Sequence, residues 1–157
     1  MQDMQESEIV GAFKEYQQTY YDGSSRKLLV TEIETPFPEG KLIVSRTDVD
    51  GIITHVNRAF VEMSGFTKEE LIGQPHCILR HPDMPAVAFK GLWDDVQQGK
   101  KWQGYVKNLR KDGGYYWVFA VVIPNVRKGK TIGYSSVRRK PSRAKVEECI
   151  KLYPTLF

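Results

Sequence analysis

Two stretches of this sequence combine polar side chains with an apolar setting, as ligand sites do. The first is the strand-like run 102–110, in which alternation places Trp102, Gly104, Val106 and Asn108 on one face. This face is the more apolar one and is expected to point inward, which leaves Asn108 as a buried amide that needs partners. An amide offers a donor and an acceptor and matches the imide edge of a heterocycle. The alternative is an asparagine bonded to nearby backbone.

The second stretch is the proline-rich segment 74–85, QPHCILRHPDMP, which contains Arg80, His81 and Asp83. Arginine can bind a phosphate through two parallel donors, and histidine can donate to a phosphate, ligate a metal or change its charge near neutral pH. Asp83 is placed to cap the helix that follows. The alternative is a self-contained ion pair that holds the loop in shape.

Familiar catalytic motifs are absent from the sequence. The histidines at positions 55, 76 and 81 do not have the HExxH spacing, and no third residue is evident to orient His76 against Cys77 as a nucleophile. There is also no GxSxG, GxxxxGKS or GxGxxG, so we do not expect an enzyme. Trp93, on the apolar face of a helical run, is either a core residue or the wall of a pocket for a flat ligand.

The composition fits one domain with short extensions. The chain has 157 residues, of which 41% are hydrophobic, 27% charged and 11% aromatic, so it can bury a core. No apolar run is long enough to span a membrane, and the N-terminus has no secretory h-region. Cys77 and Cys149 form no CxxC pair, which argues against structural zinc and a disulfide scaffold and favours a reduced, cytoplasmic setting.

Lysine and arginine outnumber aspartate and glutamate by 23 to 19, for a net charge of +4. Much of the excess positive charge lies late in the chain. We expect one group of basic residues there to form either a docking face or a solvated edge. We call this group the late basic cluster: Arg127, Lys128, Lys130, Arg138 and Arg139. Basic residues can meet phosphate, but no nucleic-acid partner is expected here.

The sequence predicts three parts: residues 1–40, residues 41–140 and residues 141–157. In the first part, apolar residues at helical spacing predict an amphipathic helix over 1–25, followed by a linker. This helix is expected either to pack on its own domain or to dimerise. Its apolar positions are Ile9, Val10, Phe13, Tyr16 and Tyr20. The last part predicts a short C-terminal helix.

Residues 41–140 predict five strands and several short helices. Asn57 is expected to cap a helix over 58–64, and Thr67 with Glu70 to form a capping box. A further helix is expected over 86–98. The strands are expected over 42–47, 52–56, 102–110, 115–124 and 131–138. Two strands, a helical middle and a three-strand meander indicate an α+β fold, with helices on one face of an antiparallel sheet.

The same region, about 42–140, resembles a PAS domain, in particular the PAS sensor of the Aer-type aerotaxis and energy-taxis family. The resemblance rests on SRTDVDGIITHVNRAFVEMSGFTKEELIG, on GQPHCILRHPDMP and on AFKGLWDDVQQGKKWQGYVKNLRKDGGYYWV. It implies the PAS fold with a five-stranded antiparallel sheet, an FAD cofactor and a role in reporting redox or electron-transport state. Arg80, His81 and Asp83 match the family's RHxD, and Asn57 matches an asparagine that opens the first short helix. Both motifs are implicated in FAD binding.

The sequence is also similar to the flavin PAS domain of the nitrogen-fixation redox regulators. The pocket positions of that family are matched here by Ser45, His76, Trp93 and Asn108, and Trp102 belongs to the WxG that precedes Asn108. The regulators have a carboxylate where His76 stands. The resemblance suggests that flavin reduction changes the hydrogen bonds of Asn108 or His76 near N5. That change would shift the helical face or the N-terminal helix.

A PAS fold can also serve other chemistry. The segment GQPHCILR aligns with the LOV photoreceptor motif GxNCRFLQ. In this alignment His76, rather than Cys77, occupies the reactive position, which argues against a photo-adduct. A haem-binding gas sensor would use His76 or His81 as its axial ligand. A ligand-free domain would serve association alone, through its two flanking helices. A flavin-dependent oxidoreductase would need a nicotinamide or substrate site, and the sequence offers none.

Full receptors of the aerotaxis family continue into a membrane anchor and a long coiled coil, and neither follows residue 157 here. We expect a cytoplasmic sensor subunit that docks on a membrane-bound, chemoreceptor-like transducer, with a homodimer through the flanking helices as a further association. The alternative is a fragment. The extensions 1–40 and 141–157 favour a self-contained protein.

Overall fold

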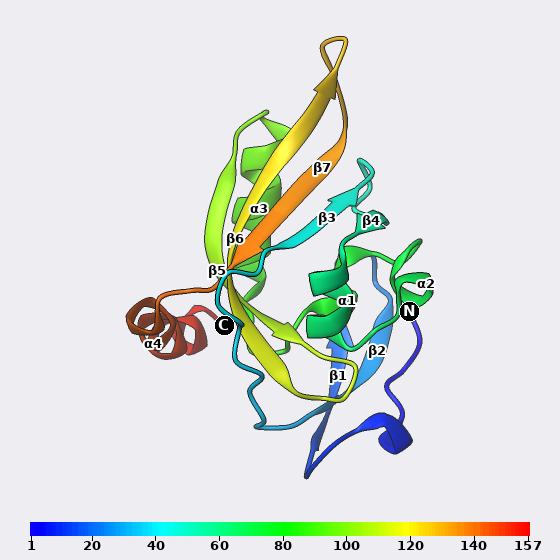
Figure 1. Ribbon diagram of the computed structural model, residues 1–157, viewed down its shortest axis with the longest axis vertical. Coiled ribbons are helices and arrows are strands. Elements are labelled where there is room, and N and C mark those ends of the chain that lie inside the picture. Colours follow the sequence, from blue (N-terminus) through cyan, green and yellow to red (C-terminus); the bar gives the residue numbers. More distant parts are fainter.

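A five-stranded antiparallel sheet forms the centre of the molecule (Figure 1), in the computed structural model that describes residues 1–157. The strand order is β4-β3-β7-β6-β5. The strands are β3 (Ile43–Thr47), β4 (Ile53–Val56), β5 (Trp102–Leu109), β6 (Tyr115–Arg127) and β7 (Lys130–Arg139). The expected α+β fold with a C-terminal meander is confirmed, although β6 and β7 extend beyond their predicted ends.

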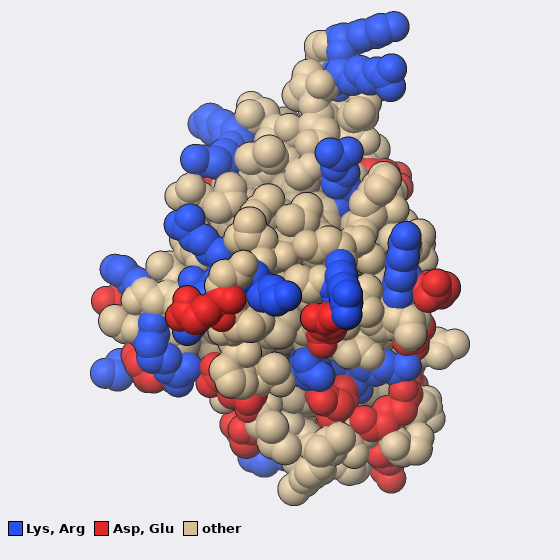
Figure 2. All heavy atoms as spheres, viewed as in Figure 1, with Lys and Arg blue, Asp and Glu red and all other residues tan.

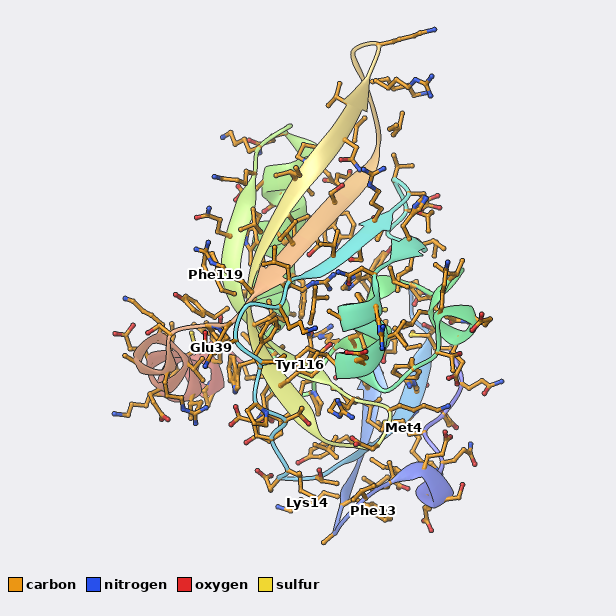
Figure 3. The ribbon with its side chains drawn as sticks, viewed as in Figure 1. Met4, Phe13, Lys14, Glu39, Tyr116 and Phe119 are labelled. Carbon is orange, nitrogen blue, oxygen red and sulfur yellow. The ribbon has the colours of Figure 1, made fainter.

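Helices cover one face of this sheet. They are α1 (Arg58–Ser64), α2 (Lys68–Leu71), the 3-10 helix His76–Leu79 and α3 (Ala86–Gln97). The main core lies between them and the sheet, where Phe60 of α1 and Tyr116 of β6 are almost completely buried. Figure 3 shows Tyr116 between β6 and α1. Because side chains alternate along a strand, Trp117 points to the other face, where it packs on Val146 and Cys149 of α4 (Arg143–Leu152).

The caps of α1 and α2 are those that the sequence predicts, but the predicted cap by Asp83 is wrong, because the N-cap residue of α3 is Pro85 and no side chain caps this helix. Asn57 Oδ1 accepts a hydrogen bond from the Phe60 N–H at 3.1 Å, and Gly65 ends α1 with a left-handed φ of 78°. Thr67 and Glu70 form the reciprocal capping box of α2. None of the helices combines the length and the apolar character that a membrane crossing requires.

The predicted N-terminal amphipathic helix is wrong. After a 3-10 turn at Glu6–Glu8, the chain forms β1 (Lys14–Thr19) and β2 (Ser25–Val30), which pair as an antiparallel hairpin. Residues 22–24, at the end of the expected helix, make the hairpin turn instead. Asp22 Oδ1 accepts from the Ser24 N–H at 2.9 Å, and Gly23 has a φ of 86°.

Burial of β2 is the physical reason for this difference. Leu28 and Leu29 are completely buried, and they form a small second core with Met4, Val30 and Leu109 of β5. Figure 3 places Met4 beside β2. The helical spacing in 1–25 gave no weight to these contacts, which lie far apart in sequence. An interface between two flanking helices is therefore not available, because only the C-terminal one exists.

Candidate functional site

A cavity of about 710 Å³ lies on the helix-covered side of the sheet. Its walls come from β3, β5, β6 and β7, from the 3-10 helix His76–Leu79 and from α3. Six of the predicted site residues line it: Ser45, His76, Arg80, Trp93, Trp102 and Asn108. The volume is in the range of pockets that enclose a small organic ligand.

The fold brings together the two polar stretches that the sequence singled out. Arg80 and Asn108 pair through an isolated antiparallel bridge, so the proline-rich loop runs beside β5. Asn108 is only 5% exposed and borders the cavity. A Cβ on Gly104 would lie 2.5 Å from the Trp102 ring. The Trp102 ring therefore fits here only because the third residue of the WxG motif is a glycine, which has no side chain.

Three side chains from distant parts of the chain form a hydrogen-bonded group in the cavity wall. Arg138 Nη2 donates to Ser45 Oγ at 2.5 Å, and Arg138 Nη1 lies 3.0 Å from His76 Nε2. Burial and the Arg138 cation lower the pKa of His76 to about 3, so its ring is neutral. Since the guanidinium can only donate, His76 Nε2 must accept, and the ring proton is on Nδ1.

Arg138 is a buried cation without a carboxylate partner. It is 2% exposed, its guanidinium lies 4.7 Å from the centre of the Phe60 ring, and its Nε has no hydrogen-bond partner. Burial lowers the pKa of Arg138 to about 10, which still leaves it charged at neutral pH. A buried, incompletely satisfied cation at a cavity wall favours an acceptor or an anionic group in the cavity.

Arg138 was missed as a site residue, because the sequence analysis placed it in the late basic cluster. Strand alternation is the signal that could have identified it. Tyr134, Ser136 and Arg138 follow a period of two, and all three line the cavity. The other members of the cluster behave as expected for a surface. Figure 2 shows basic side chains at the protruding end of the molecule, where β6 and β7 turn at 127–130.

Asn57, His81 and Asp83 do not line the cavity. Asn57 holds the start of α1 to β3, because its Nδ2 donates to the Leu42 carbonyl and its Oδ1 also accepts from the Val44 N–H. His81 is buried, and its Nδ1 accepts from the Asp83 N–H at 3.0 Å.

Burial and the neighbouring Lys107 lower the pKa of His81 to about 3. Asp83 pairs with Lys107 at 2.8 Å, and although burial raises the pKa of Asp83, the hydrogen bond and charge of Lys107 keep it below its usual value. These contacts tie the loop to β5, whereas the alternative that the sequence left open was an ion pair contained within the loop.

Aromatic walls of the cavity come from α3, β5 and β7. The Trp93 ring meets Tyr134 edge to face at 5.5 Å between centroids, and Arg80 stacks 4.9 Å above Phe89. Apolar planes near a buried amide, a hydroxyl and a guanidinium suit a flat heterocycle with one polar edge. No group of three or more His, Cys, Asp or Glu residues is arranged to hold a metal ion.

Comparison with known proteins agrees with this architecture. Residues 53–138, more than half of the chain, match the family described as PAS fold. This chain belongs to the PAS fold family. Among solved structures, the PAS domain described here is similar to the light state of the blue-light photoreceptor Aureochrome1 LOV, with a TM-score of 0.61 and 22% identity over 68% of this chain and 89% of that one. At this identity the likeness concerns the fold.

Two curated relatives are more informative about sequence. The chain is 44% identical over 127 residues to the aerotaxis receptor of Escherichia coli (strain K12), a match that covers 81% of this chain and 25% of the receptor. It is 26% identical over 106 residues to the nitrogen fixation regulatory protein of Klebsiella pneumoniae, which covers 67% of this chain and 21% of that protein. The chain thus spans about a quarter of the length of the receptor that it matches.

Proposed function

We propose that this PAS domain binds FAD in the cavity and converts the redox state of the flavin into altered contacts with a signalling partner. The observation that carries the proposal is the cavity itself, with aromatic walls and a buried polar group formed by Ser45, Arg138 and His76. The similarity to an aerotaxis receptor supports a role in aerotaxis or energy taxis and favours a chemoreceptor-like transmembrane transducer as the partner.

The residues present fit a flavin. Trp93, Phe89 and Trp102 offer apolar planes for the ring system. Asn108 offers a donor and an acceptor for its imide edge, and Arg138 has an unpartnered Nε beside the cavity. When bound, the FAD would supply the redox chemistry by accepting electrons and protons. The protein would bind and orient it, exclude water, and respond to its charge.

The response would begin at Asn108 and travel through the sheet. Asn108 pairs with Tyr116 on β6 and with the backbone of Arg80, so a changed hydrogen bond at its amide would affect both β5 and the loop before α3. On the other face, Tyr153 donates from its hydroxyl to the Tyr105 carbonyl of β5 at 2.5 Å. The strand that holds Asn108 therefore also contacts the C-terminal segment, which could pass the change to a partner.

Haem has less support in the geometry. His76 Nε2 already accepts from Arg138, and His81 lies outside the cavity lining. Both histidines that we considered as axial ligands are thus held by other groups. The cavity also has no substrate-activating base or nucleophile of unusual reactivity, which favours a sensor over an enzyme.

The test is an absorbance spectrum of the purified protein, before and after dithionite. Two flavin bands that bleach on reduction, with FAD released on denaturation, would support the proposal. A Soret band, or a protein that stays colourless after incubation with FAD, would contradict it. A blue-light bleach without reductant would point to a cysteine adduct instead. The Asn108→Ala variant is expected to lose FAD or to shift its bands, and unchanged FAD content and signalling would remove Asn108 from the mechanism.

A further inference from the structure

The N-terminal hairpin forms part of the cavity wall. Its tip contributes Tyr20 and Tyr21, which line the same cavity as Cys77 and Arg80. This hairpin forms a two-stranded sheet of its own, separate from the central five-stranded sheet, and it lies outside residues 53–138, the segment that matches the PAS fold family. It nevertheless reaches the cavity.

The hairpin is fastened to the domain at a defined place. Arg26 of β2 is 4% exposed, and its Nη1 donates to the Ile78 carbonyl at 3.0 Å while its Nε donates to the Gln2 carbonyl at 2.6 Å. Ile78 belongs to the 3-10 helix that carries His76 and Cys77. The buried Leu28 and Leu29 hold the rest of β2. The tip is therefore held against the cavity by the hydrogen bonds from the buried Arg26 guanidinium to backbone carbonyls and by the small core around Leu28 and Leu29.

Two polar atoms at this end of the cavity are buried without a partner. They are Tyr20 Oη, on a side chain that is 5% exposed, and Arg80 Nε. Burial raises the pKa of Tyr20, and the cations Arg26 and Arg80 are near enough to oppose the shift. Buried polar groups usually have a hydrogen-bond partner, and both Tyr20 and Arg80 line the cavity.

We propose that Tyr20 and Arg80 form a phosphate subsite at this end of the cavity, so that the N-terminal hairpin selects a phosphorylated flavin over the bare ring system. This inference rests on the proposed function. A hydroxyl and a guanidinium are both donors, and phosphate oxygens accept strong, charge-assisted hydrogen bonds from such a pair. Riboflavin, which has no phosphate, would leave both groups unsatisfied.

The test compares FAD, FMN and riboflavin by fluorescence quenching with the apoprotein, for the wild type and for Tyr20→Phe. This variant keeps the ring and removes only the hydroxyl. We expect Tyr20→Phe to weaken FAD binding about tenfold, as for a hydrogen bond to a charged group, and to leave riboflavin unchanged. FMN tells whether one phosphate is sufficient. The control is Tyr16→Phe, the same change on β1 at a half-exposed residue outside the cavity, which should affect no ligand.

The apoprotein gives a second readout. Because Tyr20 Oη has no partner there, Tyr20→Phe should be at least as stable to urea as the wild type while it binds FAD more weakly. Equal losses for FAD and riboflavin, or no loss for either, would overturn the phosphate subsite. If the wild type binds none of the three flavins, the proposed function fails. If it binds FAD and Tyr20→Phe binds equally well, only the subsite fails.

Discussion

At the residue scale, Ser45 is the hydroxyl acceptor that holds the buried Arg138 guanidinium. Replacing Ser45 by alanine leaves a charged donor, Arg138 Nη2, without its acceptor. We expect Ser45→Ala to lower the free energy of unfolding by about 1–3 kcal/mol in urea titrations of the apoprotein. The matched control is Ser135→Ala, which removes a neutral hydrogen bond to Asn125 on the neighbouring strand. A loss no larger than that of the control would show that Arg138 does not depend on Ser45.

The two neutral histidines give the protein a predictable pH dependence. Burial lowers the pKa of His76 and His81 to about 3, with Arg138 and Lys107 acting in the same direction. The unfolded chain takes up these protons near pH 6.5, so between that pH and about 3 it binds more protons than the folded protein. Stability is therefore full above pH 6.5 and falls on acidification, by up to about 1.4 kcal/mol per pH unit for each histidine.

Urea unfolding of the apoprotein between about pH 7.5 and 5.5 measures this slope before the carboxylates titrate. His81→Gln should reduce the slope by the share of one histidine, because His81 no longer takes up a proton on unfolding. A slope that His81→Gln does not alter would mean that His81 is protonated in the folded state.

At the element scale, the pairing of β3 with β7 depends on a glycine. A Cβ on Gly133 would lie 2.1 Å from the Thr47 carbonyl oxygen. We expect Gly133→Ala to separate these strands locally and to destabilise the protein by about 1–3 kcal/mol or more, measured by thermal or urea unfolding.

The opposite result is expected for a glycine in a helix. Gly91 lies inside α3, and a Cβ there would meet no atom within 4 Å. Gly91→Ala should therefore stabilise the protein by about 0.5–1 kcal/mol, because alanine loses less backbone freedom on folding. If both alanine variants lost stability equally, the close approach at Gly133 would not be the cause of its effect.

At the scale of the whole molecule, a ligand enclosed by four strands, α3 and the N-terminal hairpin should stabilise all of them together. FAD at a hundred times its Kd is expected to raise the free energy of unfolding by about 2.7 kcal/mol, provided that the unfolded chain does not bind it. A rise in Tm that depends on FAD concentration checks this. Asn108→Ala should show a smaller rise, and a Tm independent of FAD would argue against the enclosed site.

Local sequence signals determined the short helices and the inward-facing side of β5. Asn57, Thr67 with Glu70, and Gly65 each act on neighbouring backbone groups, so the short helices could be placed from sequence. Strand alternation placed Asn108 on the inner face of β5 and Trp102 in the cavity wall. These features depend on periodicity and on contacts over a few residues, which a sequence displays directly.

Tertiary structure alone decided the rest. Residues 14–30 form a hairpin because Leu28 and Leu29 are buried against Leu109, about 80 residues later in the chain, and no local pattern reports such a contact. Arg138 is a cavity residue because β7 pairs with β3 and faces Ser45, which the order of charged residues does not reveal. Burial and partners are properties of the assembled sheet, and they determine which of several similar side chains reaches the site.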